Sequence, residues 1–218
     1  ARCRRVRQMR RGRLMDSARV RDAFAGAADH FVATVTRVPA DAWDRQGLGE
    51  WSVRALVGHT SRALLTVETY LAAGAARVDV PGPVEYFMVA LGPTADHSAI
   101  AERGRQAGAA LGDDPAGAVR TLAERVVAQV QRAADSDLVG TPAGGMTLIA
   151  YLPTRIFELA IHTLDLAAAL GVAGSLPDAA AAVTLDLVAA LARRRGRDTE
   201  LLLAATGRGA LPAGYTVL

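Results

Sequence analysis

The sequence contains a single cysteine and no lysine, so all 25 of its basic residues are arginine. Cys3 has no second cysteine with which to form a disulfide inside the chain, as is usual for proteins of the reducing cytoplasm. No cysteine follows it, which excludes a cysteine nucleophile from the body of the protein. Any thiol chemistry must therefore use a thiol supplied from outside.

Long hydrophobic runs are also missing. No apolar run reaches the roughly 20 residues that a membrane-spanning helix needs, because Arg, Glu, His or Asp interrupts the longest stretches. The basic N-terminus is not followed by the apolar segment of a secretory signal. The sequence therefore predicts a cytoplasmic protein that has no membrane partner.

Acidic residues are missing from the first 14 positions, ARCRRVRQMRRGRL, which include seven arginines. The whole chain has a formal net charge of +3, so residues 15–218 carry −4. An arginine run can bind nucleic acid, but no interleaved aromatic residues or recognition-helix pattern accompany this one. We interpret residues 1–14 as a basic tail. The alternative is that the natural protein starts at Met15 and that the preceding residues are upstream sequence. We expect no nucleic-acid partner.

What the sequence has in abundance is alanine, which with leucine is among the best helix formers, so a mainly α-helical fold is predicted. Capping residues, glycines and prolines delimit the helices. These are predicted over residues 16–38, 52–73, 98–111, 113–134 and 147–170, with one more entered through Pro177. Asp16 or Ser17 is expected to cap the first helix and Ser52 the second.

The connections between these helices have unequal lengths. Residues 75–97 are predicted to be a long connection with one or two helical turns at VEYFMVAL, and SDLVGTPAGGM, residues 136–146, a loop. Four longer helices around one core favour an all-α antiparallel four-helix bundle over residues 15–171. Residues 172–218 are expected to form a short C-terminal extension of helix plus coil.

One apolar stretch, RIFELAIHTLDLAAALG at residues 155–171, contains Glu158 and His162. Positions i and i+4 of a helix share a face. His59, which follows Gly58, lies on or beside the apolar stripe of another predicted helix. Burying an ionised carboxylate without a partner is costly, and a divalent metal would supply that partner. The alternative is a hydrogen-bonded pair without metal.

Two histidines and one glutamate suit zinc and leave a fourth coordination position open, as in catalytic sites. Nickel, iron and manganese remain open, because His and carboxylate ligands accept several metals. We expect His30 to be a core or boundary residue. His97 is expected to face solvent or cap a helix, with the mouth of a pocket as the alternative. Trp43 and Trp51 are expected to pack the end of the bundle.

Two blocks of the sequence resemble the mycothiol-dependent maleylpyruvate isomerase family, which belongs to the DinB-like superfamily of four-helix bundles. They are GEWSVRALVGHTSRAL at 49–64 and TPAGGMTLIAYLPTRIFELAIHTLDLAAALG at 141–171, with an R-x-x-E-x-x-x-H-x-x-D signature in the second. The segment LLLAATGRGALPAGYTVL is similar to the terminus of actinobacterial members. The resemblance covers most of residues 16–218.

This resemblance implies an up-down-down-up bundle, a metal that is normally zinc, and the ligands His59, Glu158 and His162. It also has limits. Characterised members carry a larger α/β C-terminal domain, whereas only 47 residues follow Gly171 here. The arginine with which the isomerases engage substrate carboxylates has no clear counterpart. By rough position it matches Arg103 or Arg105, and Arg155 lies one turn before Glu158.

Arg155 and Asp165 are the candidate catalytic residues. Asp165, three residues after His162, is expected to accept a hydrogen bond from a ligand imidazole and so fix its tautomer. A salt bridge to an arginine of a neighbouring helix is the alternative. Arg155 is expected to bind a substrate carboxylate bidentately, with an ion pair to Glu158 or Asp165 as the alternative.

The function that the resemblance implies is activation of a mycothiol-type low-molecular-weight thiol, for cis–trans isomerisation or S-transfer on a small-molecule substrate. A metal at an open site lowers the pKa of a bound thiol. The thiolate would add to a conjugated double bond, and elimination after rotation would give the trans product. The alternatives are a non-catalytic metal- or ligand-binding bundle and a metal-dependent tailoring enzyme of secondary metabolism. A homodimer is left open as the assembly.

Overall fold

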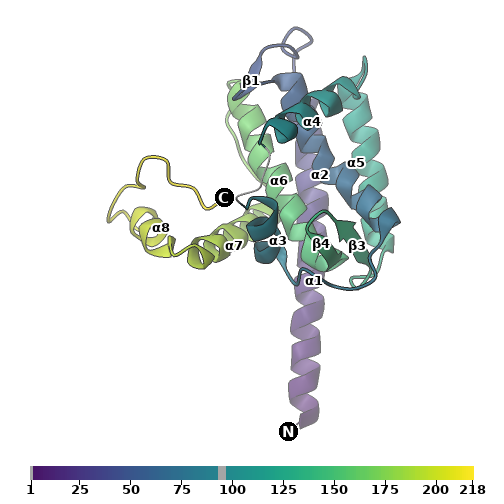
Figure 1. Cartoon of the computed structure of the whole chain (residues 1–218), viewed down its shortest axis with the longest axis vertical. Coiled ribbons are helices and arrows are strands. Elements are labelled where there is room, and N and C mark those ends of the chain that lie inside the picture. The colour runs from purple at the N-terminus through teal and green to yellow at the C-terminus, as the bar shows by residue number, and fades with distance from the viewer. Residues whose placement is uncertain (1, 93–96) are drawn as a thin grey trace.

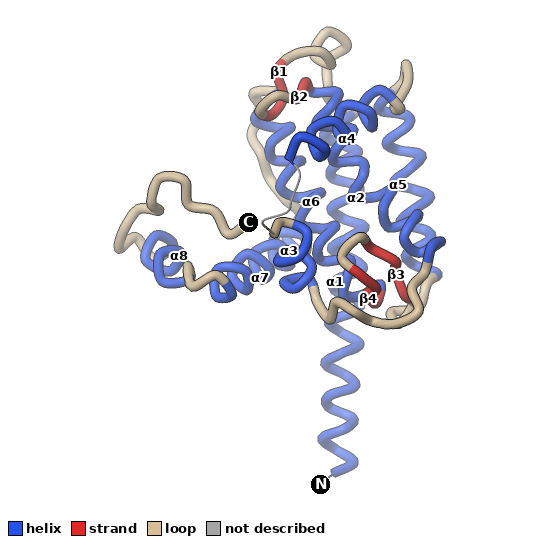
Figure 2. The backbone as a smooth tube through the Cα atoms, viewed as in Figure 1, coloured by secondary structure: helices blue, strands red, loops and turns tan. Residues whose placement is uncertain are grey.

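The structure is a computed structural model that describes residues 2–92 and 97–218 (Figures 1 and 2). It is mainly helical, as predicted from the composition, and it also contains two small two-stranded sheets that were not predicted. The central helices are α1 (Arg2–Val35), α2 (Val53–Ala73), α5 (Pro115–Arg132) and α6 (Leu148–Ala169). Both α1 and α2 pack against both α5 and α6, which makes these four helices a bundle around one core.

The direction of each helix follows from contacts along its length. Arg54, at the start of α2, donates to the carbonyl of Gly112 just before α5, and Glu68 further along α2 pairs with Arg125 of α5. The helices α2 and α5 are therefore parallel. In contrast, the start of α6 contacts the later part of α2, where the Tyr151 hydroxyl donates to Thr66. The resulting order is up-down-down-up, as the resemblance implies (Figure 1).

The first helix begins earlier than predicted. It starts at Arg2, not at Asp16, and ends at Val35 rather than Val38. Residues 2–15 contain no proline and are rich in arginine, a good helix former, so the helix continues through them. Ser17 caps nothing: its hydroxyl donates to Asp135 at 2.6 Å, across to the end of α5. The predicted cap at Asp16 or Ser17 was therefore wrong.

The starts of α2 and α5 agree with those predicted from the sequence. Ser52 caps α2 by accepting a hydrogen bond from the backbone of Ala55, and Gly74 ends the helix at a φ of 60°. Asp114 caps α5 by accepting from Gly117. Two shorter helices, α3 (Pro83–Ala90) and α4 (His97–Ala109), lie in the long connection between α2 and α5, and α4 packs along α2.

Two hairpins were missed by the sequence analysis. The stretch predicted as a loop at residues 136–146 contains β3 (Leu138–Thr141), which pairs with β4 (Gly144–Thr147), and β1 (Gln46–Leu48) pairs with β2 (Trp51–Ser52). Glycine hides the alternation of side chains in both β3 and β4. At Gly145 it is required sterically, because a Cβ would lie 2.0 Å from the carbonyl oxygen of Arg77.

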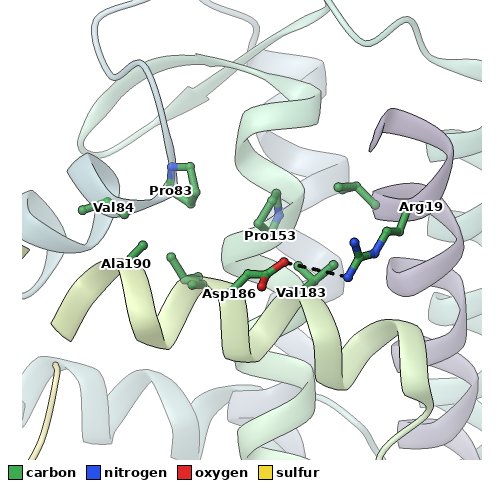
Figure 3. Close-up of a pocket in the computed structure, with 9 residues that line it drawn as sticks. Arg19, Pro83, Val84, Pro153, Val183, Asp186 and Ala190 are labelled. Atoms are coloured by element: carbon green, nitrogen blue, oxygen red, sulfur yellow. Dashed lines mark ion pairs between the residues drawn. The ribbon is translucent and has the colours of Figure 1, made fainter. Parts of the chain in front are cut away.

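The C-terminal extension adds α7 (Asp178–Arg194), α8 (Asp198–Ala205) and a coil. Helix α7 packs against α1 and α6, and leaves a hollow of about 230 Å³ whose rim carries the ion pair between Arg19 and Asp186 (Figure 3). The coil returns to the bundle, where Val217 is buried with Phe87 of α3 and Phe157 of α6. Within the part of the chain that the structure describes, no helix has the length and apolar character needed to cross a bilayer.

Candidate metal centre

The antiparallel packing of α2 against α6 brings together the three residues that the sequence analysis singled out. The Nε2 atom of His162 lies 3.3 Å from Oε2 of Glu158, and Nε2 of His59 lies 3.8 Å from the same oxygen. The two imidazole rings are nearly perpendicular, with centroids 4.8 Å apart. One donor atom from each residue falls within 4.8 Å of the others. Two imidazole nitrogens and a carboxylate oxygen so arranged fit a divalent metal ion.

Burial and hydrogen bonding shift the pKa values of Glu158, His162 and His59 in different directions. Burial alone would raise the pKa of Glu158, but the two histidines and Arg155 hold it well below its usual value. Burial would likewise lower the pKa of His162, yet hydrogen bonds to Asp165 and Glu158 raise it to about 9. The pKa of His59 is lowered, chiefly by burial. These shifts favour the ionised form of Glu158, the protonated form of His162 and the neutral form of His59.

Each histidine is held by a different neighbour. His162 Nδ1 lies 2.9 Å from Oδ2 of Asp165, the contact expected from their spacing. His59 Nδ1 is buried and has no hydrogen-bond partner among the described residues. Its ring instead lies against the indole of Trp51, with centroids 4.4 Å apart and 30° between the ring planes. The sequence analysis assigned Trp51 only to packing, and nothing in its spacing from His59 predicted this contact.

The donor atoms face a cavity of about 770 Å³, large enough for a small-molecule ligand. Helices α2, α3, α4 and α6 line it, together with the turn between β3 and β4. Leu218 also reaches the cavity, a contribution from the C-terminal extension that no motif predicted. The cavity wall therefore combines segments that are far apart in the sequence.

Arg155 supplies a buried positive charge to this cavity. Only 7% of the residue is exposed, and the guanidinium lies over the rings of Tyr151 and Tyr86, 4.9 and 5.4 Å from their centroids. It donates to the Tyr86 hydroxyl at 3.3 Å and to Thr154 at 3.0 Å. Among the side chains that the structure describes, at positions 17–92 and 98–218, no carboxylate forms an ion pair with it, and Glu158 and Asp165 pair with histidines instead. The alternative of a pair with Glu158 or Asp165 is therefore not what the structure contains.

The other arginines considered from the sequence are placed differently. Arg103 lines the cavity from α4 and is exposed, whereas Arg105 pairs with Glu102 on the surface at 3.0 Å. Arg62, one turn after His59, also lines the cavity, and the sequence analysis missed it. Its spacing of three residues from His59 on one helix was the available signal.

The remaining histidines do not join the site. His30 is half-buried on α1, as predicted, and is not part of the cavity wall. The side chain of His97 lies outside the described residues. Trp43 packs against Arg54, whose guanidinium lies 5.5 Å from the ring centroid, in agreement with a packing role at the end of the bundle.

Comparison with known proteins identifies the bundle. Residues 24–167 match the family described as the mycothiol maleylpyruvate isomerase N-terminal domain. The match covers more than half of the chain and includes all three candidate ligands, so the chain belongs to this family. No curated protein and no solved structure was found to match it.

Proposed function

From this family membership, we propose that the protein is a metal-dependent enzyme that activates a low-molecular-weight thiol for cis–trans isomerisation or S-transfer. The observation that carries the proposal is the convergence of His59, Glu158 and His162 on one point of a large cavity that also contains an unpaired, buried Arg155. A glutamate–histidine pair that lay on the surface, or that was buried only to support the fold, would not need to face a large cavity.

The chain's own residues would hold the metal and its ligands in place. His59, Glu158 and His162 are the proposed ligands, with zinc as the preferred ion. Asp165 accepts the Nδ1 proton of His162, which leaves Nε2 free to face the ion. A divalent ion with one open position lowers the pKa of a bound thiol, so that a thiolate forms at neutral pH. Mycothiol is the thiol that the family name indicates.

Arg155 defines the proposed substrate end of the cavity. The guanidinium has no direct ion-pair partner among the described side chains, and its donor fork can hold an anionic ligand such as a carboxylate. The tyrosines on which it stacks keep the guanidinium in place and leave part of its donor fork without a described partner. We therefore propose a substrate with a carboxylate next to a conjugated double bond. Arg62 and Arg103 would add to the positive potential that attracts it.

In the proposed isomerisation, the thiolate sulfur adds to one alkene carbon and the electron pair of the double bond moves into the conjugated carbonyl. Rotation about the resulting single bond follows. Return of the electron pair re-forms the double bond in the trans geometry and expels the thiolate, so no proton or electron is gained overall. S-transfer stops after the addition, with a proton taken up at carbon.

The first experiment measures the metal content of untagged protein by elemental analysis, for the wild type and for His59→Ala, Glu158→Gln and His162→Ala. We expect about one equivalent of zinc or another transition metal in the wild type, and a loss of most of this metal in each variant. His30→Ala is the matched control, because His30 lies outside the cavity wall, and it should bind normally.

The second step tests the thiol. Cobalt-substituted protein should develop a sulfur-to-metal absorption band with mycothiol, and should then convert an unsaturated cis-carboxylate only when the thiol is present. Arg155→Gln should raise the KM for that substrate without changing the metal content. An absence of bound metal in the wild type, or metal binding that survives all three substitutions, would overturn the proposal. Metal binding without any response to thiols would leave a binding protein.

A further inference from the structure

The two histidines of the candidate metal centre differ in what fixes their orientation. A ligand histidine usually donates its second nitrogen to a carboxylate or carbonyl, which orients the ring. His162 does this through Asp165. His59 has no such partner among the described residues, and its Nδ1 is buried. Some other contact must therefore keep its Nε2 directed toward Glu158.

The contact that the structure offers is the indole of Trp51. This ring lies against the His59 imidazole in a tilted contact, with a centroid distance of 4.4 Å and 30° between the ring planes. The indole is itself fixed, because its Nε1 donates to the backbone carbonyl of Ala101 on α4 at 3.0 Å. Trp51 also approaches the ring of His162 edge-on, at 6.5 Å. It therefore contacts both proposed imidazole ligands.

Helix α4 packs closely against this indole because the residues at the contact, Gly58, Gly104 and Gly108, have no side chain. A Cβ on Gly104 would lie 2.9 Å from the indole, and a Cβ on Gly58 would lie 2.1 Å from the backbone nitrogen of Gly108. The backbones of α2 and α4 therefore touch at the turn that precedes His59. Trp51 is enclosed between α4 on one side and His59 on the other.

We propose that Trp51 is a positioning residue for His59. The contact with its ring orients His59, as the hydrogen bond to Asp165 orients His162. This inference rests on the proposed metal site. A metal ion on Nε2 makes the imidazole electron-poor, which strengthens its stacking on the electron-rich indole. The indole thus stabilises the metal-bound form as well as the ring orientation.

Trp51 can be observed directly, because the chain contains only two tryptophans. In Trp43→Phe protein stripped of metal, all tryptophan emission comes from Trp51. Added Co²⁺ should quench this emission with saturation at one equivalent, and excess Zn²⁺ should reverse the quenching. Emission that does not change at saturating Co²⁺ would overturn the proposal without any substitution of Trp51.

Substitutions then separate the stacking from the packing. We expect Trp51→Leu to lower the Zn²⁺ affinity by about 10- to 100-fold, and Trp51→Phe, which keeps an aromatic face, to restore most of it. Trp43→Leu is the matched control at the same end of the bundle and should stay within about twofold of the wild type. Circular dichroism and thermal unfolding check that each variant is folded.

The outcome for His59→Ala distinguishes failure of this inference from failure of the proposed function. If His59→Ala binds Zn²⁺ as tightly as the wild type, the metal site itself is wrong. If His59→Ala loses Zn²⁺ while folded Trp51→Leu retains wild-type affinity, the site stands and only the role of Trp51 is refuted. Equal losses in Trp51→Leu and Trp51→Phe would also refute it, because the aromatic face would then be irrelevant.

Discussion

The two sides of the cavity hold their functional groups in different ways. On the α6 side, Arg155, Glu158, His162 and Asp165 follow one another along a single helix, and Asp165 orients His162 from within that helix. On the α2 side, His59 depends on a tryptophan that α4 holds in place. His162 is thus oriented from within its own helix, whereas His59 is oriented by a contact between helices. The α2 side should therefore be the more sensitive to distant changes in packing.

The largest effect is expected from a single methyl group at Gly58. A Cβ there would lie 2.1 Å from the backbone of Gly108, so Gly58→Ala must separate α4 from α2. We expect a loss of about 2 kcal/mol or more in the free energy of unfolding, as for other overpacked sites. Release of Trp51 should weaken Zn²⁺ binding in the same variant. Chemical denaturation and metal competition measure the two effects.

The control for this substitution is Gly26→Ala on α1, where the nearest heavy atom to a new Cβ lies 3.8 Å away, at ordinary contact distance. Alanine favours helix more than glycine does, so this variant should be more stable by roughly 0.5–1 kcal/mol, with unchanged Zn²⁺ binding. If both substitutions had the same effect, the close contact between α2 and α4 would not explain the result at Gly58.

The second effect concerns the proton on His162. Without metal, hydrogen bonds to two carboxylates raise its pKa to about 9, so a metal ion must displace a proton from Nε2 at neutral pH. The apparent Zn²⁺ affinity should therefore rise about tenfold per pH unit between pH 7 and 9, and level off above that. His59 should add nothing to this slope, because its pKa is lowered and its ring is already neutral.

Asp165→Asn tests the α6 side of this comparison. Removal of the carboxylate lets the pKa of His162 fall toward its ordinary value, so the dependence of Zn²⁺ affinity on pH should become flatter between pH 7 and 9. The affinity at pH 9 should still fall about 10-fold, because the neutral amide oxygen accepts the Nδ1 hydrogen more weakly than the carboxylate does and leaves Nε2 a poorer ligand. Trp51→Leu should lower the affinity by a similar factor while the slope with pH stays that of the wild type. Competition with a chromophoric chelator across this range gives both quantities.

The same contrast explains what could be predicted from the sequence. The triad and the Asp165 contact rest on positions i, i+3 and i+4 of helices, whose geometry is local and regular. The contact of Trp51 with His59 was missed because it depends on how α4 packs. The glycines at positions 58, 104 and 108 have no side chain whose pattern could reveal that packing. The hairpin of β3 and β4 was missed for a similar reason, since glycine hid its alternation.

The smallest effect is expected on the side of α2 that faces away from the cavity, where Arg125 of α5 donates two hydrogen bonds to the Glu68 carboxylate, at 2.7 and 3.0 Å. The pKa of Glu68 is lowered, chiefly by Arg125. The pair therefore stabilises the fold above the ordinary carboxyl pKa, and this stabilisation is lost as the pH falls through the lowered value.

Glu68→Gln should cost at most about 1 kcal/mol in the free energy of unfolding near neutral pH, because the pair is largely exposed. Thermal unfolding at pH 7 and at progressively lower pH measures the cost, which should shrink as Glu68 becomes protonated in the folded protein. Zn²⁺ affinity should stay within about twofold, because Trp51 rather than α5 holds His59 in place. A loss of affinity as large as that in Trp51→Leu would mean that the position of the whole helix controls His59.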